Sequence, residues 1–220
     1  MSKYQVKFYT GNYGKRQKAA NRDNAICYVE QHFNAAVDPE TNYALVIVGK
    51  NASQTSMRWG DWLADEYSSR LNITKYGVSV GGFDGRGNGN IVKTNMPAVL
   101  LEPLFCSSYD GAAVLKSYHG QKTLAKVIVD SIQKFFPDGG LVAFSIGHKG
   151  KTSKPHDRGA LVLAGGTEAE YAEIVLTLAE KMLTGVDDDP ILDAEDFAYL
   201  SELKERGLTI DQLVEAYEQT

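Results

Sequence analysis

The sequence lacks most of the features that mark secreted, membrane-spanning or nucleic-acid-binding proteins. Its two cysteines, Cys27 and Cys106, are too few for a disulfide framework and lack the paired spacing of a metal motif. No apolar run approaches the roughly 18 residues that a transmembrane helix needs, and the first residues are strand-like, without the apolar segment of a secretory signal. The net charge of −5 argues against nucleic acid or an anionic membrane as the main partner. We therefore expect synthesis in the cytoplasm and no nucleic-acid or membrane partner.

The composition that remains is that of an ordinary globular α/β protein, with 43% hydrophobic and 23% charged residues. Strand patterns occupy residues 3–9, 25–32, 43–48, 97–101 and 141–146, and helical patterns occupy 16–24, 53–71, 124–135 and 167–183. Residues 75–90 are rich in glycine, which indicates a loop-rich excursion. This alternation predicts a single twisted β-sheet, mostly parallel or mixed, flanked by helices.

The character of the chain changes after Gly185. An acidic, proline-containing break is followed by two short helical patterns, at residues 193–206 and 209–219. We therefore expect a catalytic domain over residues 1–184 and an acidic linker with a short helical appendage over residues 185–220.

Two of the four histidines, His32 and His148, follow predicted strands. Open α/β sheets bind ligands at the carboxyl ends of their strands, and catalytic zinc sites combine imidazoles with a carboxylate and an open position. A single histidine in such a place usually just ends a strand, but two in one small domain favour metal ligands. For His156, which lies in a loop, a solvated or supporting role is the better interpretation.

The helix predicted from residue 167 offers three acids, Glu168, Glu170 and Glu173. With roughly 100° per residue, Glu168 lies nearest to the apolar face of this helix and Glu173 farthest from it. Acids in a first helical turn also interact favourably with the helix dipole, which explains part of this enrichment. Glu168 is the preferred ligand, and Glu170 stays open as an alternative.

Glu102 ends the continuous apolar run of residues 97–101. A carboxylate at the end of a buried strand is costly unless it is paired or functional. A general base next to a metal-activated water would suit this position, and an ion pair with an arginine is the alternative.

Four segments together resemble one known family, the zinc-dependent N-acetylmuramoyl-L-alanine amidases called amidase 3. They are "NMPAVLLEPLFCSSYD" around Glu102, "YVEQHFNA" around His32, "RQKAANRDNA" before it, and "FSIGHKG…HDRGALVLAGGTEAEY" around His148 and Glu168. The third segment contributes Arg16, Ala20 and Asn21. Together the segments span most of residues 1–184, and their combination is far more specific than any one of them.

The order of these segments differs from the family's. Family members open with the Gly-His strand, whereas here that unit, residues 141–183, comes last. A circular permutation restores the pattern, with the family's usual ends joined near residues 138–140. Permutation at exposed turns is physically tolerated because domain termini often lie close together.

The resemblance implies specific roles for individual residues. His32, His148 and Glu168 would bind Zn²⁺, and Glu102 would be the catalytic acid/base. Asn34 and Arg158 are weaker candidates for binding substrate, as is the glycine-rich stretch 81–89. Between His148 and Glu168 extra residues intervene, which keeps Glu170 possible, and Lys149-Gly150 replaces the family's Gly-Gly.

The activity implied is hydrolysis of the amide between N-acetylmuramic acid and L-alanine in peptidoglycan. Peptidoglycan would be the partner. A phage endolysin released at lysis would fit a wall enzyme without a visible signal, and a bacterial enzyme exported by another route is the alternative. Two alternatives are a catalytically inactive peptidoglycan-binding relative and a zinc peptidase of the stem peptide. The oligomeric state is left open.

Overall fold

The computed structural model describes residues 2–163 and 165–186 of the chain, which lie in its first compact unit. In chain order the elements are β1 (Tyr4–Phe8), α1 (Tyr13–Arg22), β2 (Cys27–Gln31), β3 (Tyr43–Val48), α2 (Gln54–Leu71), β4 (Thr74–Val80), α3 (Asn88–Ile91), β5 (Ala98–Glu102), α4 (Tyr109–Lys116), α5 (Tyr118–Phe135), β6 (Gly140–Ile146) and α6 (Glu168–Thr184). The helices predicted for the acidic tail lie outside the described residues.

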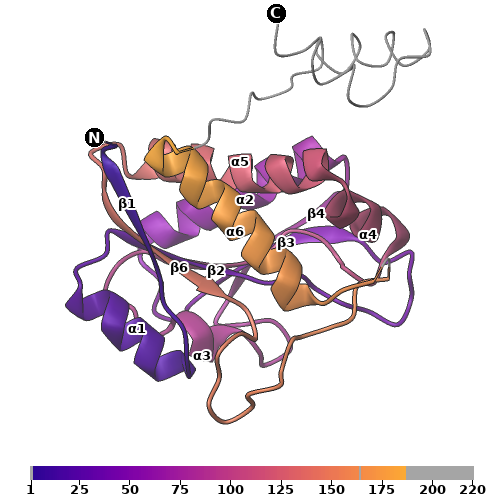
Figure 1. The fold of residues 1–220 in the computed structure, drawn as a ribbon, viewed down its shortest axis with the longest axis horizontal. Coiled ribbons are helices and arrows are strands. Elements are labelled where there is room, and N and C mark those ends of the chain that lie inside the picture. The colour runs from indigo at the N-terminus through magenta and orange to yellow at the C-terminus, as the bar shows by residue number, and fades with distance from the viewer. Residues whose placement is uncertain (1, 164, 187–220) are drawn as a thin grey trace, which may run out of the picture. The chain divides into compact units, whose positions relative to one another are not determined.

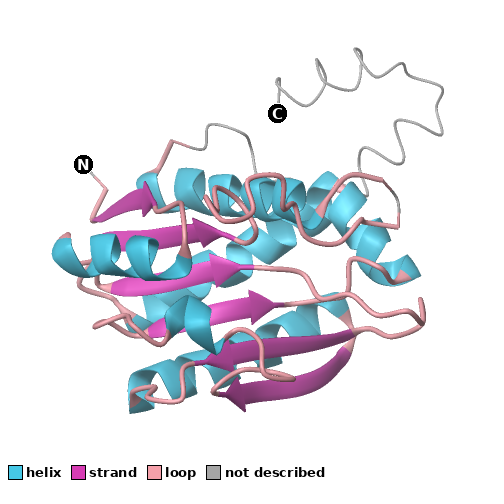
Figure 2. Ribbon diagram, turned by 90° about the horizontal axis from the view of Figure 1, so that it is seen from below, coloured by secondary structure: helices cyan, strands magenta, loops and turns pink. Residues whose placement is uncertain are grey.

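The strands form one six-stranded sheet in the order β1-β6-β2-β5-β3-β4 (Figure 2). Neighbouring strands are parallel except β3 and β5, which pair antiparallel with Leu45 opposite Glu102. A mixed sheet flanked by helices confirms the predicted fold class. Because β6, β2 and β5 are parallel neighbours, their carboxyl ends open at the same edge of the sheet.

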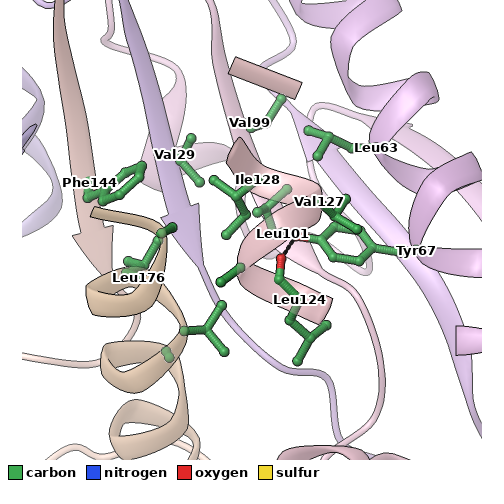
Figure 3. Packing of buried hydrophobic residues seen from close by; sticks show 14 of the residues in the cluster. Val29, Leu63, Tyr67, Val99, Leu101, Leu124, Val127, Ile128, Phe144 and Leu176 are labelled. Atoms are coloured by element: carbon green, nitrogen blue, oxygen red, sulfur yellow. Dashed lines mark hydrogen bonds between the residues drawn. The ribbon is translucent and has the colours of Figure 1, made fainter. Parts of the chain in front are cut away.

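Helices cover both faces of the sheet (Figure 1). On one face α2, α5 and α6 pack against a large apolar core, and on the other α1 and α3 pack against a smaller one. Figure 3 shows the larger core, where the strand residues Val29, Val99, Leu101 and Phe144 meet the helix residues Leu63, Leu124, Ile128 and Leu176.

Strand alternation decides which residues of β2 can reach a site. Val29 belongs to the larger core and Tyr28 to the smaller one, because successive side chains point to opposite faces. The period of two therefore assigns Glu30 to the α1/α3 face, the same face as Tyr28. The same alternation in β5 assigns Glu102 to that face, after Leu100.

The structure corrects one sequence expectation, that residues 75–90 are loop. Residues 74–80 form β4, which lies at the edge of the sheet and, within the described residues, pairs with β3 alone. Gly77, with φ of +100°, lies where the β3–β4 register shifts between Ala44 and Leu45. An edge strand needs little apolar alternation and tolerates such an irregularity, so its pattern resembles a loop.

Two short elements also escaped the sequence patterns: helix α4 and the single turn of α3. None of the helices in the described part of the chain is both long enough and apolar enough to cross a membrane.

Candidate metal centre and active site

A cavity of about 620 Å³ opens at the carboxyl ends of β2 and β5 on the α1/α3 face. Its walls come from several segments: residues 32–35 after β2, most of the glycine-rich stretch 85–90, Glu102 at the end of β5, and His148, Asp157, Gly159 and Ala160 in the loop before α6. This is the edge at which parallel strands place ligand-binding groups.

Three side chains converge at this cavity. His32, His148 and Glu168 each present a ligand atom, and these atoms lie within 4.8 Å of one another. Nδ1 of His32 is 2.8 Å from Oε1 of Glu168, and Nε2 of His148 is 3.2 Å from Oε2 of the same carboxylate. Two imidazoles and one carboxylate are a donor set that catalytic zinc sites use.

The start of α6 separates the roles of its acids. Glu170 forms a capping box with Thr167, its Oε2 accepting from the Thr167 N–H at 2.7 Å. Glu168 is instead 4% exposed and also accepts backbone N–H groups from Phe33 and Ala160. Of the two acids left open by the sequence, the structure therefore brings Glu168 to the histidines.

Two glycines make room for this convergence. A Cβ at Gly147 would lie 2.6 Å from ring atoms of His32, and one at Gly159 would lie 2.2 Å from Oε2 of Glu168. Real Cβ atoms do not approach other atoms so closely. The packing of His32 therefore requires glycine at position 147, and the packing of Glu168 requires glycine at position 159.

His32 contacts a second carboxylate, Glu30, with its other nitrogen. The distance from Nε2 of His32 to Oε1 of Glu30 is 3.0 Å. Glu30 is fully buried and accepts from Arg16, Asn90 and Tyr28. Burial opposes ionisation of Glu30, but Arg16, His32 and Asn90 outweigh burial and lower its pKa.

His148 has an analogous partner in Asp157. Nδ1 of His148 lies 2.7 Å from Oδ1 of Asp157, and Nζ of Lys151 lies 3.0 Å from Oδ2. Burial opposes ionisation of Asp157, but hydrogen bonds from Lys151, Gly159 and His148 hold its pKa below the usual range. His148 itself has a φ of +61°, a left-handed conformation that is uncommon for a non-glycine residue.

Tyr13, at the start of α1, connects these two arrangements. The guanidinium of Arg16 and Nζ of Lys151 each lie 5.0 Å from the centre of its ring. Such distances permit cation–π attraction. The two cations that support the carboxylates are therefore also tied to one another.

The charge state of the metal-free centre follows from these contacts. Burial disfavours a charged His32, but hydrogen bonds to Glu168 and Glu30 outweigh burial and raise its pKa to about 10. Burial likewise opposes ionisation of Glu168, and the two histidines lower its pKa. Without metal, the charged ring of His32 therefore pairs with both Glu30 and Glu168.

Glu102 lines the same cavity without joining this cluster. Its Oε2 is buried, and no described group lies within hydrogen-bond distance of it. Burial raises the pKa of Glu102 to about 8, with His32 acting in the opposite direction and Glu168 adding to the rise. An unpaired carboxyl with a pKa in this range suits proton transfer near neutral pH.

The weaker substrate candidates separate in the structure. Asn34 lines the cavity next to His32. Arg158 is exposed, hydrogen-bonds the carbonyl oxygens of Pro155 and Asp157, and is not among the cavity-lining residues. His156 is also exposed.

Comparison with protein families decides the relationship. A family model described as N-acetylmuramoyl-L-alanine amidase, Amidase_3, matches residues 4–134, more than half of the chain. The chain belongs to the amidase 3 family. A comparison with curated proteins gives no match.

Solved structures of several amidases have a similar fold. The N-acetylmuramoyl-L-alanine amidase of Clostridium difficile 630 aligns with a TM-score of 0.51 at 20% identity, over 57% of this chain and 66% of that chain. The catalytic domain of CwlV from Bacillus (Paenibacillus) polymyxa var. colistinus gives 0.49 and 24%, and AmiC2 of Nostoc punctiforme gives 0.49 and 20%, with the same coverages. The alignments thus span just under two thirds of each solved chain.

The extent of the family match is itself informative. It includes His32 and Glu102 but ends before β6, so His148 and Glu168 lie outside it. Two of the three clustered donor groups therefore come from residues that the family match does not cover.

Sequence reasoning did not identify Glu30 or Asn90 as parts of the site. For Glu30 a signal exists, because a charged residue inside a strand buried on both faces is the same anomaly that singles out Glu102. Its spacing of two from His32 also puts both on one face. Asn90 gives no such signal, since it lies in a glycine-rich stretch.

Proposed function

We propose that this amidase 3 family member hydrolyses the amide bond between N-acetylmuramic acid and L-alanine in peptidoglycan, with zinc as its metal. The observation that carries the proposal is the convergence of His32, His148 and Glu168 beside Glu102 in one cavity. Family membership supplies the substrate class.

The donor set fits zinc. Two imidazole nitrogens and one carboxylate leave a position open, as in catalytic zinc sites with two histidines and a glutamate. A zinc ion bound there would polarise the scissile carbonyl and lower the pKa of its bound water. His32, His148 and Glu168 would hold the ion.

The remaining chemistry belongs to Glu102. In its ionised form Glu102 takes a proton from the attacking water and then passes that proton to the leaving amine of L-alanine. Its Oε2 has no described hydrogen-bond partner, which supports this role because no described group competes for the proton. Asn34 lines the same cavity, which supports its proposed role in binding substrate.

The test is the release of free L-alanine amino ends from purified peptidoglycan, its loss with a chelator and its recovery with zinc. Glu102→Gln should lower kcat by about 10²–10⁴-fold, the usual contribution of a general acid/base, while zinc binding stays within about threefold. Full activity of Glu102→Gln would contradict the mechanism. New amino ends at other stem-peptide residues would indicate a peptidase, and zinc binding without any product an inactive relative.

We also propose that the domain is circularly permuted. The family match stops before β6 and α6, yet these elements provide two of the three donor groups. Ser2 Oγ donates to the carbonyl of Leu183 at 2.6 Å, so the end of α6 lies beside the start of β1. Joining these points and opening the chain near residue 138 would restore the family order.

A rearranged chain tests the permutation. Residues 138–186 followed by a short linker and residues 2–137 should fold with the same circular dichroism spectrum and bind one zinc. If this rearranged chain failed to fold while the parent chain folded under the same conditions, the result would count against the proposed circular permutation.

A lytic role is a further proposal that follows from the bond cleaved, because breaking stem peptides from glycan strands weakens the wall. Release at host lysis, as for a phage endolysin, is the form of delivery we propose. Loss of turbidity of wall preparations after addition of the protein measures the activity itself.

A further inference from the structure

We infer that Glu30 is a positioning residue that fixes the ring of His32 with Nε2–H toward itself and Nδ1 toward the metal. The inference rests on the proposed zinc function and deepens it. It concerns a carboxylate that belongs neither to the donor cluster nor to the cavity-lining residues.

The geometry of the His32 ring carries the first step. Its two nitrogens face two different carboxylates, Glu168 at 2.8 Å from Nδ1 and Glu30 at 3.0 Å from Nε2. Glu168 belongs to the donor cluster and Glu30 does not. The nitrogen that faces the cluster is therefore Nδ1.

The second step is that Glu30 is itself held in place. Oε1 of Glu30 accepts from Arg16 and Asn90 as well as facing His32, and Oε2 accepts from the Tyr28 hydroxyl at 3.3 Å. The side chains of Glu30 and Arg16 are 0% exposed. A carboxylate so constrained can only accept a hydrogen bond from Nε2–H, which keeps the proton on Nε2 and leaves Nδ1 free to bind a metal.

The local sequence explains why Glu30 is in reach. Glu30 and His32 are two residues apart at the end of β2, so strand alternation puts both on the α1/α3 face. Arg16 comes from α1 and Asn90 from α3, the two helices that cover this face. The support of His32 is thus built from three elements around one carboxylate.

A ligand role for Glu30 itself does not fit. Its Oε1 already contacts three donors, and the ring of His32 separates it from Glu168. Carboxylates that accept the second N–H of a metal-bound histidine fix its orientation, and their loss typically weakens metal binding 10–100-fold.

Removing Glu30 alone would leave Arg16 as an unpaired buried charge and risk unfolding. Two double variants avoid this. Arg16→Met with Glu30→Leu removes both charges and the acceptor, whereas Arg16→Met with Glu30→Gln removes the charges and keeps an amide oxygen for Nε2–H. Arg70→Met with Asp130→Leu is the matched control, since it removes a pair that joins α2 to α5 outside the cavity.

The measurement is the zinc dissociation constant, by competition with a chromophoric chelator in the full chain. We expect the Leu double variant to bind zinc 10–100-fold more weakly than wild type, the Gln double variant at least fivefold more tightly than the Leu variant, and the control like wild type. Equal affinities of the two Glu30 double variants would overturn the inference, as would affinities within threefold of wild type for both.

A second readout needs no variant. Long-range ¹H–¹⁵N spectra of the zinc-loaded wild type should show a protonated Nε2 and a metal-bound Nδ1 for His32. A proton on Nδ1 would overturn the inference while leaving the proposed function intact. A wild type that binds no zinc would overturn both.

Discussion

The two histidines of the centre have matching sets of partners in different surroundings. Each ring lies between Glu168 and a second carboxylate, and each second carboxylate is paired with a cation. On the His32 side, the side chains of Glu30 and Arg16 are fully buried. On the His148 side, Asp157 is 21% exposed and Lys151 is 9% exposed.

The difference follows from the elements involved. Glu30 and Arg16 lie in β2 and α1, where the sheet and helix pack together. Asp157 and Lys151 lie in the long segment between β6 and α6, which reaches solvent. The carboxylate–cation pairs should therefore orient the histidine ligand on both sides, whereas only the Glu30–Arg16 pair should contribute much to stability.

The largest expected effect is the loss of free energy of unfolding when Arg16 is replaced, compared with the replacement of Lys151. Arg16→Met should lower this free energy by about 3–5 kcal/mol, because it removes the fully buried guanidinium that pairs with the buried charge of Glu30. Lys151→Met should lower it by about 1 kcal/mol or less, because solvent reaches Asp157 and replaces the lost partner. Urea unfolding with chelator present measures both.

Losses of equal size would show that the burial difference does not decide the energetics. Both variants keep an unbranched side chain along the ring of Tyr13, so the packing lost is similar. Asp130→Asn, on the surface of α5, serves as the control for simple loss of a partly exposed charge.

The fold could be predicted from sequence where periodicity was strong. The apolar run ending at Glu102 and the helix beginning near Glu168 are confirmed as β5 and α6. β4 could not, because an edge strand with glycine at its register shift carries almost no pattern. Local periodicity reflects the burial of side chains, and too few side chains of an edge strand are buried to produce a clear pattern.

At the candidate site, the sequence pattern singles out the three clustered donor residues but not the groups that support them. His32, His148 and Glu168 each have a signal in their own segment, and the structure brings them together. The pairing of Glu30 with Arg16 depends on how α1 packs on β2, which no local pattern encodes. Arg158 is not among the cavity-lining residues, whereas its neighbour Gly159 is.

The next effect, on metal affinity, tests the exposed side. Asp157→Ala should weaken zinc binding by about tenfold, the low end of the usual range for such partners. The loss should be this small because water can replace Asp157 as the hydrogen-bond acceptor of the partly exposed His148. Glu173→Ala is the control, since Glu173 pairs with Lys149 next to His148 without touching its ring. A loss of about 100-fold or more, the upper end of the usual range for such partners, would show that water does not replace Asp157 and would remove the distinction between the two sides.

The smallest effect concerns Glu102, which belongs to neither side and has no described hydrogen-bond partner for its buried oxygen. Its pKa is raised from 4.5 to about 8, so between these values the folded metal-free protein binds a proton that the unfolded chain has lost. The stability of the wild type relative to Glu102→Gln should therefore be greatest below about pH 4.5 and should fall as the pH rises to about 8. The cavity admits solvent, so we expect about 1 kcal/mol or less over this range. Urea unfolding of both proteins with chelator at several pH values measures the difference. A difference that stays constant with pH would mean that Glu102 ionises normally and has a partner in solution, which would weaken its assignment as the base.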